Sequence, residues 1–230
     1  MIIAGLQKLT LLDYPGKIAA IVFTQGCNFA CGYCHNPTMI PVIDEQKPEL
    51  HQKNILKFFR SRRGLLDGIV VSGGEPTLQK GLLDFLEKVK EMDFLIKLDT
   101  NGSNPEKLRQ VIKRGLVDYL ALDVKATKQK YRDLVKNDAA NKVLETISLI
   151  KNSGVDYEFR STILPHCHDE QDIREMGEMI KGCKRWYLQS FRATKTLLRS
   201  FQQQQSFTTY ELQHLQVVAE QYAERVEVRS

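Results

Sequence analysis

Three of the five cysteines in this chain of 230 residues stand close together, at Cys27, Cys31 and Cys34. They directly follow an apolar run that is typical of a strand, and a loop at that place crosses the surface, where side chains have no core to fill. Three thiolates that converge in such a loop can bind a metal centre. A structural zinc site normally takes four ligands, and the fourth is missing locally. Three thiolates on a cubane iron–sulfur cluster leave one iron open, and an open metal position is typical of a catalytic site.

A turn rich in glycine follows the next expected strand. Gly73 and Gly74 have no side chains, so a ligand can approach their backbone closely and find carbonyl oxygens that accept hydrogen bonds from an ammonium group. Glu75 adds a negative charge beside them. On its own such a turn is common, and its simplest interpretation is structural.

Carboxylates and a lysine end the next two expected strands. Asp99, Thr100 and Asn101 end the first of them, and Asp123 and Lys125 end the second. By their chemistry, the lysine could bind a carboxylate and the aspartates a cation or hydroxyl groups, so that together they would hold a zwitterion. The alternatives are a surface turn for the first group and a salt bridge for the second.

Arg160 lies within a run that otherwise has the pattern of a buried strand. Because arginine is rarely buried without a partner, we expect its side chain to face the open end of the sheet or a carboxylate such as Glu158. Short runs of histidine and cysteine after a strand are more often polar loop residues, and isolated cysteines lack a C-x2-C partner. We therefore assign no metal role to a further group of residues: His35, His166, Cys167, His168 and Cys183.

The composition, with 42% hydrophobic and 27% charged residues, is that of an ordinary soluble globular protein. No apolar run has the length of a transmembrane helix, and the N-terminus lacks the basic region of a signal peptide. We expect a cytoplasmic protein with reduced cysteines and no membrane partner. The formal net charge of +5 comes from scattered basic residues, which permits an acidic partner without indicating nucleic acid.

Strands and helices are expected to alternate along the whole chain. The lead-in 1–17 should hold an extra strand or hairpin, and Val226 and Val228 an edge strand. Six β-α units with short connections indicate parallel strands joined by right-handed crossovers, either in an open doubly wound sheet or in part of a barrel. Both architectures build their sites where the strands end, as the motifs above do. The expected strands are 18–24, 68–72, 94–98, 117–122, 157–164 and 185–189, and the expected helices are 49–62, 80–92, 105–114, 139–152, 169–181 and 208–222.

A polar segment at 192–207 contains four consecutive glutamines, from Gln202 to Gln205. We expect a flexible connection into the last helix, and a mobile lid over the site is the alternative. The whole chain, 1–230, is expected to be a single domain.

The cysteine loop resembles a known signature. Its C-x3-C-x2-C spacing, with an aromatic residue before the third cysteine, resembles that of the radical S-adenosylmethionine (SAM) enzymes. The string CGYCHN at 31–36 resembles the glycyl-radical-enzyme activases. The strings GLQK at 5–8 and DYPG at 13–16 resemble the anaerobic ribonucleoside-triphosphate reductase activating proteins. This resemblance implies a (β/α)6 partial TIM barrel, and thus the second of the two architectures.

The resemblance also implies a chemistry. Cys27, Cys31 and Cys34 would ligate a [4Fe–4S] cluster whose open iron binds the amino and carboxylate groups of SAM. Reduction by one electron would cleave SAM and give a 5′-deoxyadenosyl radical, which in the activases abstracts a hydrogen atom from a glycine of a partner enzyme. The chain has no second cluster motif, so the resemblance implies an external electron donor such as flavodoxin or ferredoxin.

Further roles follow from the same resemblance. Asp99, Thr100 and Asp123 would bind a monovalent cation. The activases have a histidine at the sixth strand that contacts SAM, and here Gln189 could supply the missing hydrogen bonds. The aromatic ring of Tyr33 could pack against the adenine or equally on the protein. The other implied SAM contacts are Gly73, Gly74, Glu75, Asn101, Lys125 and Arg160.

Three functions remain open. The first is an activase whose substrate is a glycyl-radical enzyme, such as an anaerobic ribonucleotide reductase. The second is a radical SAM enzyme that acts on a small molecule, similar to 7-carboxy-7-deazaguanine synthase. The third is a non-enzymatic module that binds zinc or a cluster. The sequence shows no added substrate-recognition domain, which leaves an open barrel mouth and favours entry of a protein loop.

Overall fold

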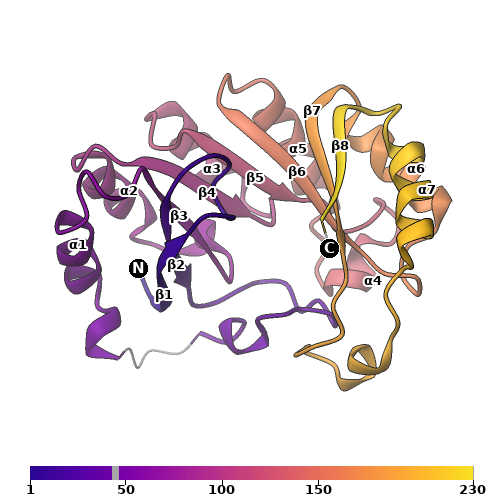
Figure 1. The fold of residues 1–230 in the computed structure, drawn as a ribbon, viewed down its shortest axis with the longest axis horizontal. Helices are drawn as coiled ribbons and strands as arrows, with labels where there is room; N and C mark the ends of the chain where they lie inside the picture. Colours follow the sequence, from indigo (N-terminus) through magenta and orange to yellow (C-terminus); the bar gives the residue numbers. More distant parts are fainter. Residues whose placement is uncertain (43–46, 230) are drawn as a thin grey trace. The chain divides into compact units, whose positions relative to one another are not determined.

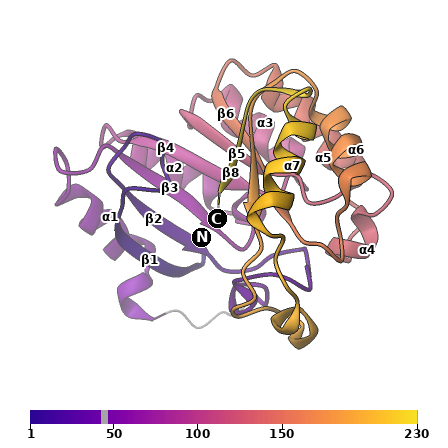
Figure 2. The same cartoon turned by 45° about the vertical axis from the view of Figure 1, so that its right-hand side comes forward.

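The computed structural model describes residues 1–42 and 47–229 as an α/β fold (Figure 1 and Figure 2). Within this part of the chain, eight strands form one sheet whose order follows the chain from β1 to β8. A doubly wound sheet reverses its strand order at a switch point, whereas successive strands of a TIM barrel are neighbours. The strand order therefore selects the second architecture, and the fold is of the partial TIM barrel type.

The chain packs as two compact units. The first unit consists of Met1–Asn28, Thr38–Thr100 and Glu106–Leu120. Its strands are β1 (Ile3–Thr10), β2 (Ala19–Thr24), β3 (Gly68–Gly73), β4 (Leu95–Thr100) and the start of β5 (Tyr119–Asp123). Its helices are α1 (Gln52–Arg60), α2 (Leu82–Lys90) and α3 (Pro105–Lys113), with short 3-10 helices at η1 (Pro37–Met39), η2 (Pro48–Leu50) and η3 (Pro76–Leu78).

The lead-in forms a hairpin with the first buried strand. β1 pairs antiparallel with β2, and the turn before β2 is closed where the N–H of Lys17 donates to the carbonyl of Tyr14 at 3.1 Å. β2 then pairs parallel with β3, and β3 parallel with β4. The residues of β2 and β3 are almost all buried, as expected of parallel strands that are covered on both faces.

An apolar cluster at the start of these strands holds the hairpin against the sheet. Tyr14 from the hairpin turn packs its ring 5.9 Å from that of Tyr119 on β5. Ala19, Ile21 and Val70 complete the buried part of the cluster. The turn residue that the sequence places before the sheet therefore belongs to the core.

The second unit consists of Phe29–Pro37, Asn101–Pro105 and the chain from Ala121 onward. β6 pairs parallel with β7, and β7 with β8, so that the edge strand expected at Val226 and Val228 is present. The unit holds the end of β5 with β6 (Asp156–Ile163), β7 (Cys183–Ser190) and β8 (Ala223–Arg229), the helices α4 (Tyr131–Val135), α5 (Ala140–Lys151), α6 (Glu170–Ile180) and α7 (Thr209–Ala219), and the 3-10 helix η4 (Arg199–Gln203).

The helices begin where the sequence provides capping residues. Thr208 and Glu211 form the capping box that the sequence predicts for α7. A second capping box, at Asp169 and Asp172, starts α6. The five residues of α4 were not expected as a helix, because so short an element carries no readable 3.6-residue period. Among the described residues, no helix has the length and apolarity needed to cross a bilayer.

Candidate active site

The glycine-rich turn after β3 lies against the residue that precedes the cysteine loop. The N–H of Gly74 donates to the carbonyl of Thr24 at 2.9 Å, and the N–H of Glu75 donates to the carbonyl of Gly26 at 2.8 Å. A Cβ at Gly74 would lie 2.2 Å from the oxygen of Gly26, and Gly73 has a φ of +112°. Gly74 is therefore required for lack of space, and Gly73 for its backbone conformation. The close backbone approach therefore brings the turn directly beside the start of the cysteine loop.

The carboxylate of Glu75 is fully buried and held by donors. Its Oε1 atom accepts hydrogen bonds from the backbone N–H of Thr77 at 3.0 Å and from the hydroxyl of Thr100 at 2.8 Å. A buried carboxylate is tolerated only when it is hydrogen-bonded in this way. The sequence analysis assigns Glu75 to SAM and Thr100 to a monovalent cation, and the structure shows these two side chains in direct contact.

Asp99 is paired with a lysine that the sequence analysis did not single out. Lys97 is 2% exposed, and its Nζ lies 2.9 Å from Oδ1 of Asp99. The hydroxyl of Ser72 donates to the other carboxylate oxygen at 3.0 Å. Side chains two positions apart on a strand lie on the same face, so the spacing of Lys97 and Asp99 in the sequence already indicated that they could pair.

In the second unit, Asp123 lies between two cations. Its carboxylate is 2.9 Å from Nε of Arg160 and 3.2 Å from Nζ of Lys125. Burial would raise the pKa of Asp123, but the guanidinium of Arg160 and then the ammonium of Lys125 outweigh it and lower that pKa to about 2. The prediction that Arg160 faces a carboxylate is confirmed, although Glu158 is farther away, at 3.9 Å.

The row of charges continues beyond Arg160 through Glu158 to Arg229, which sequence reasoning missed. Glu158 is 1% exposed and accepts hydrogen bonds from Arg229 at 3.3 and 3.2 Å. The guanidinium of Arg229 also lies 3.3 Å from the centre of the Tyr187 ring. Asp123, Arg160, Glu158 and Arg229 therefore alternate in sign from β5 through β6 to β8, and each buried charge has an opposite partner.

His168 fixes the backbone that carries Lys125. The N–H of Leu164 donates to Nδ1 of His168 at 3.2 Å, so Nε2 carries the proton and donates to the carbonyl of Lys125 at 2.9 Å. Burial lowers the pKa of His168. Both ring nitrogens thus bind backbone groups, and the position of Lys125 depends on a histidine that no sequence motif marks for this role.

The later part of the cysteine loop folds as a turn in the second unit. The N–H of Cys34 donates to the carbonyl of Cys31 at 3.0 Å. Burial raises the pKa of the Cys31 thiol, although the charge of Lys125 opposes that effect. Tyr33 is buried, and among the described residues its hydroxyl has no hydrogen-bond partner. Its ring lies 6.1 Å from that of Phe201, which is the protein packing named above as one alternative.

The remaining predicted contacts have different surroundings. Asn101 is buried and accepts a hydrogen bond from the N–H of Ser103 at 2.9 Å, so its side chain closes a local turn. Gln189 lines a polar pocket of about 260 Å³ at the carboxyl ends of β6 and β7. The lining of this pocket is His35, Thr162, Gln189, Ser190, Arg192 and Arg229.

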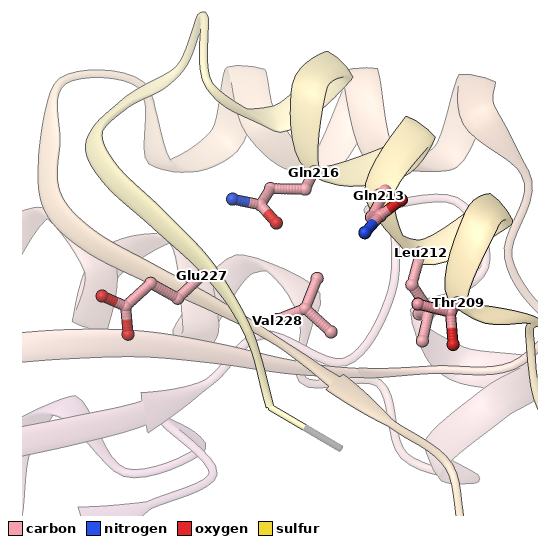
Figure 3. A pocket seen from close by; sticks show the side chains of 6 residues that line it. All are labelled: Thr209, Leu212, Gln213, Gln216, Glu227 and Val228. Carbon is pink, nitrogen blue, oxygen red and sulfur yellow. The ribbon is translucent and has the colours of Figure 1, made fainter.

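A larger pocket, of about 350 Å³, lies between α7 and β8 (Figure 3). Gln213 and Gln216 come from the helix, and Glu227 and Val228 from the strand. Thr209 and Leu212 complete the lining, which contains none of the residues predicted for the site. The candidate site is therefore the set of strand-end residues and the cysteine loop.

The cysteines and the remaining metal candidates are consistent with a reduced protein. All five cysteines are free thiols. Cys183 lies buried in β7, where burial raises its pKa to about 12. In the part of the chain that the structure describes, no three His, Cys, Asp or Glu side chains gather into a metal site. Cluster ligation by the loop cysteines is therefore argued from their spacing.

The chain is similar to known proteins over most of its length. Residues 21–181 match the sequence model of the radical SAM superfamily. The chain is 34% identical over its full length to a protein of Methanocaldococcus jannaschii that is named as a glycyl-radical enzyme activating enzyme, of which it covers 96%. It is 29% identical to a pyruvate formate-lyase-activating enzyme of Clostridium pasteurianum, over 79% of this chain and 77% of that relative.

Solved structures share the fold at low identity. SuiB of Streptococcus suis matches with a TM-score of 0.68 and 13% identity. The match covers 91% of this chain and 48% of SuiB. A domain of a pyruvate-formate lyase-activating enzyme from Bacteroides vulgatus has a TM-score of 0.56 at 17% identity, over 71% of this chain and 99% of that domain. These likenesses agree with the strand order described above.

We expect a stability contribution from His168 that disappears in acid. The folded-state pKa of His168 is lowered from 6.5, so the unfolded chain binds more protons as the pH falls below that value. The contribution is fully present above pH 6.5 and is lost as the pH falls towards the lowered folded-state pKa. Urea unfolding at a series of pH values should show a shallower acid slope for His168→Gln than for the wild type. The exposed His166→Gln control should follow the wild type, and identical slopes in all three proteins would contradict the account.

Proposed function

Because this chain belongs to the radical SAM superfamily, we propose that it cleaves SAM at a [4Fe–4S] cluster in order to install a glycyl radical on a partner enzyme. The observation that carries this proposal is the 34% identity over the whole chain to a relative named as a glycyl-radical enzyme activating enzyme. The strings at 5–8 and 13–16 favour an anaerobic ribonucleotide reductase as that partner. The non-enzymatic alternative is set aside, since the relatives are enzymes of the activating type.

Cys27, Cys31 and Cys34 are the proposed cluster ligands. Their thiols are free, as ligation of a cluster requires. With the cluster and SAM bound, the site would supply one-electron reduction of SAM, which gives methionine and a 5′-deoxyadenosyl radical. The protein holds and orients these groups and leaves that chemistry to them.

The residues of the first unit suit the amino group of SAM. The buried carboxylate of Glu75 and the close glycine turn at Gly73 and Gly74 offer acceptors and a negative charge for an ammonium. The hydrogen bond from Glu75 to Gly26 ties this turn to the residue before Cys27. We propose this turn as the site of the SAM amino group.

Lys125 is the proposed contact for the SAM carboxylate. Burial lowers the pKa of Lys125, but the charge of Asp123 together with the nearby Tyr33 and Cys31 outweighs burial and raises that pKa well above its usual value, so Lys125 is a cation at neutral pH. A buried polar atom without a partner is rare in proteins, and the hydroxyl of Tyr33 is such an atom among the described residues. A polar ligand beside Lys125 would supply that partner. Arg160, Asn101 and Gln189 are proposed as further contacts.

A monovalent cation at Asp99, Thr100 and Asp123 stays a prediction. In the structure Asp99 pairs with Lys97, and the hydroxyl of Thr100 donates to Glu75. A cation would therefore share these oxygens with the groups that now hold them.

If the cluster in the cysteine loop is the only one, the electron that reduces it must come from another protein. We propose a flavodoxin or ferredoxin as donor, in the cytoplasm, where free thiols persist. The net charge of +5 supports an acidic surface on the protein partners and favours their approach.

Replacement of any loop cysteine should abolish the cluster. We expect that Cys27→Ala, Cys31→Ala and Cys34→Ala, purified without oxygen, lose the iron and sulfide that the wild type carries. Each thiolate ligates a separate iron, so none can replace another. Iron and sulfide analysis with visible absorption measures this, and Cys167→Ala and Cys183→Ala serve as matched controls that retain the cluster. Zinc instead of iron in the anaerobic wild type would contradict the proposal.

Lys125→Ala should weaken SAM binding and leave the cluster in place. A charge-assisted hydrogen bond contributes about 1.5–3 kcal/mol, so the dissociation constant should rise by roughly tenfold to a hundredfold. Calorimetric titration of the cluster-loaded protein measures the change. Lys130→Ala is the control, since Lys130 also pairs with a carboxylate, that of Asp172 at 2.6 Å. Unchanged affinity in Lys125→Ala would mean that Lys125 serves Asp123 alone.

The activase function itself is tested by electron paramagnetic resonance. An anaerobic mixture of reduced protein, SAM and a candidate glycyl-radical enzyme should develop a doublet on the larger polypeptide, and deuteration of glycine at Cα should collapse it. A free deoxyadenosyl radical is indiscriminate, so SAM cleavage should be slow until that partner is present. If no polypeptide gains a radical while a purine or pterin precursor is consumed with SAM, the function is that of a small-molecule enzyme.

A further inference from the structure

The segment that connects β7 to α7 (gold in Figure 1) packs directly on the middle of the cysteine loop. The N–H of Leu198 donates to the carbonyl of Gly32 at 2.9 Å. The ring of Phe201, in η4, lies 6.1 Å from the ring of Tyr33 at an interplanar angle of 58°. Gly32 and Tyr33 are the two residues that separate Cys31 from Cys34. Both therefore contact a segment that is distant in sequence.

The same segment also contacts the end of the loop. The ring of His35, which follows Cys34, stacks on Phe191 with the ring centres 5.6 Å apart. Its Nε2 atom lies 3.1 Å from the carbonyl oxygen of Arg192. Phe191 in turn packs edge-on against Phe201 at 6.5 Å. Two rings of the segment, Phe191 and Phe201, thus contact two rings of the loop that lie on either side of its third cysteine.

The fit at Gly32 leaves no room for a side chain unless Phe201 moves. A Cβ there would lie 2.5 Å from Cε2 of Phe201 and 3.0 Å from Cδ1 of Leu198. The backbone of Gly32 is outside the left-handed region, so its conformation alone would accept alanine. Packing against Leu198 and Phe201 is therefore what requires glycine at this position.

We propose that Leu198 and Phe201 form a clamp that fixes the backbone of the cysteine loop between Cys31 and Cys34, two of the proposed cluster ligands. The proposal rests on the proposed function. A loop that must bring three thiolates to one centre loses conformational freedom when it does so, and an existing brace reduces that loss. Leu198 and Phe201 act through Gly32 and Tyr33, so they are positioning residues. The segment at 192–207, expected from the sequence as a flexible connection or a lid, then has a role in assembling the site.

The reactivity of the thiols in the metal-free protein tests the clamp without any cofactor. Alkylation depends on the exposure and thiolate content of each cysteine, and mass spectrometry measures it residue by residue. In Phe201→Ala, we expect Cys31 to react about tenfold faster than in the wild type, because the loop that buries its thiol loses its contact at Gly32 and Tyr33 and opens more often. Cys183, buried in β7, should keep its wild-type rate and reports on global unfolding. Unchanged alkylation of Cys31 would overturn the proposal.

Three further variants separate packing from other effects. Tyr33→Phe keeps the ring under Phe201 and should leave the Cys31 rate unchanged. Phe207→Ala removes the same side chain from the same segment, outside the clamp, and should also react like the wild type. Phe201→Leu retains an apolar side chain and should restore most of the protection, even if Phe201→Ala destabilises the whole protein. If Phe201→Leu protects Cys31 no better than Phe201→Ala, the clamp is refuted.

A double-mutant cycle tests the contact itself. Gly32→Ala should raise the alkylation rate of Cys31 when Phe201 is present, since the new methyl group collides with its ring. In the Phe201→Ala background the same substitution should have almost no further effect. If the two changes multiply instead, Gly32 and Phe201 act independently and the clamp is wrong.

The holoprotein gives a second readout. In the presence of a chelator, Phe201→Ala should lose its visible cluster absorption several-fold faster than the wild type and Phe207→Ala. Equal rates of loss would show that the clamp has no bearing on the cluster. Failure of the proposed function would have a different result. The wild type would take up no iron–sulfur cluster, while the difference in Cys31 reactivity between the wild type and Phe201→Ala would remain.

Discussion

The cysteine loop depends on one constraint: at certain glycines the backbone lies so close to its surroundings that a side chain would collide. In the first unit, Gly74 lies so near the carbonyl of Gly26 that a methyl group would overlap it. In the second unit, a methyl group on Gly32 would lie 2.5 Å from the ring of Phe201. The first contact places the glycine-rich turn after β3 beside Gly26, the residue before Cys27. The second packs Phe201 on the backbone between Cys31 and Cys34. Each of these two contacts lies within one unit.

Charge pairing is the second requirement of the site. Asp123, Arg160, Glu158 and Arg229 alternate in sign, so the buried Glu158 and the partly buried Arg160 both have opposite charges within reach. An arrangement of this kind allows ionised groups to remain in a largely apolar sheet. It also leaves Lys125 as a cation at the strand end, held by Asp123 on its side chain and by His168 on its backbone. A site for a zwitterion needs such a cation.

The sequence predicts the order of strands and helices well, because each long element carries its own apolar period and its own capping residues. It also locates the strand-end motifs, since these follow from the positions of the strands. What it misses depends on contacts between residues far apart in the chain. Glu158 pairs with Arg229, a partner that the strand pattern does not reveal, and the contact of Phe201 with Gly32 joins positions with no shared local pattern. The role of the segment at 192–207 could therefore not be read from its polar composition.

The central claim is that the cysteine loop holds a cluster with one open iron that takes the amino group of SAM beside Glu75. Electron–nuclear double resonance on the reduced protein, with SAM labelled at its amino nitrogen, tests this claim most directly. The account predicts a coupling between the labelled nitrogen and the spin of the cluster, lost together with the cluster in Cys31→Ala. A reduced cluster whose spectrum is unchanged by SAM and by the label would contradict it.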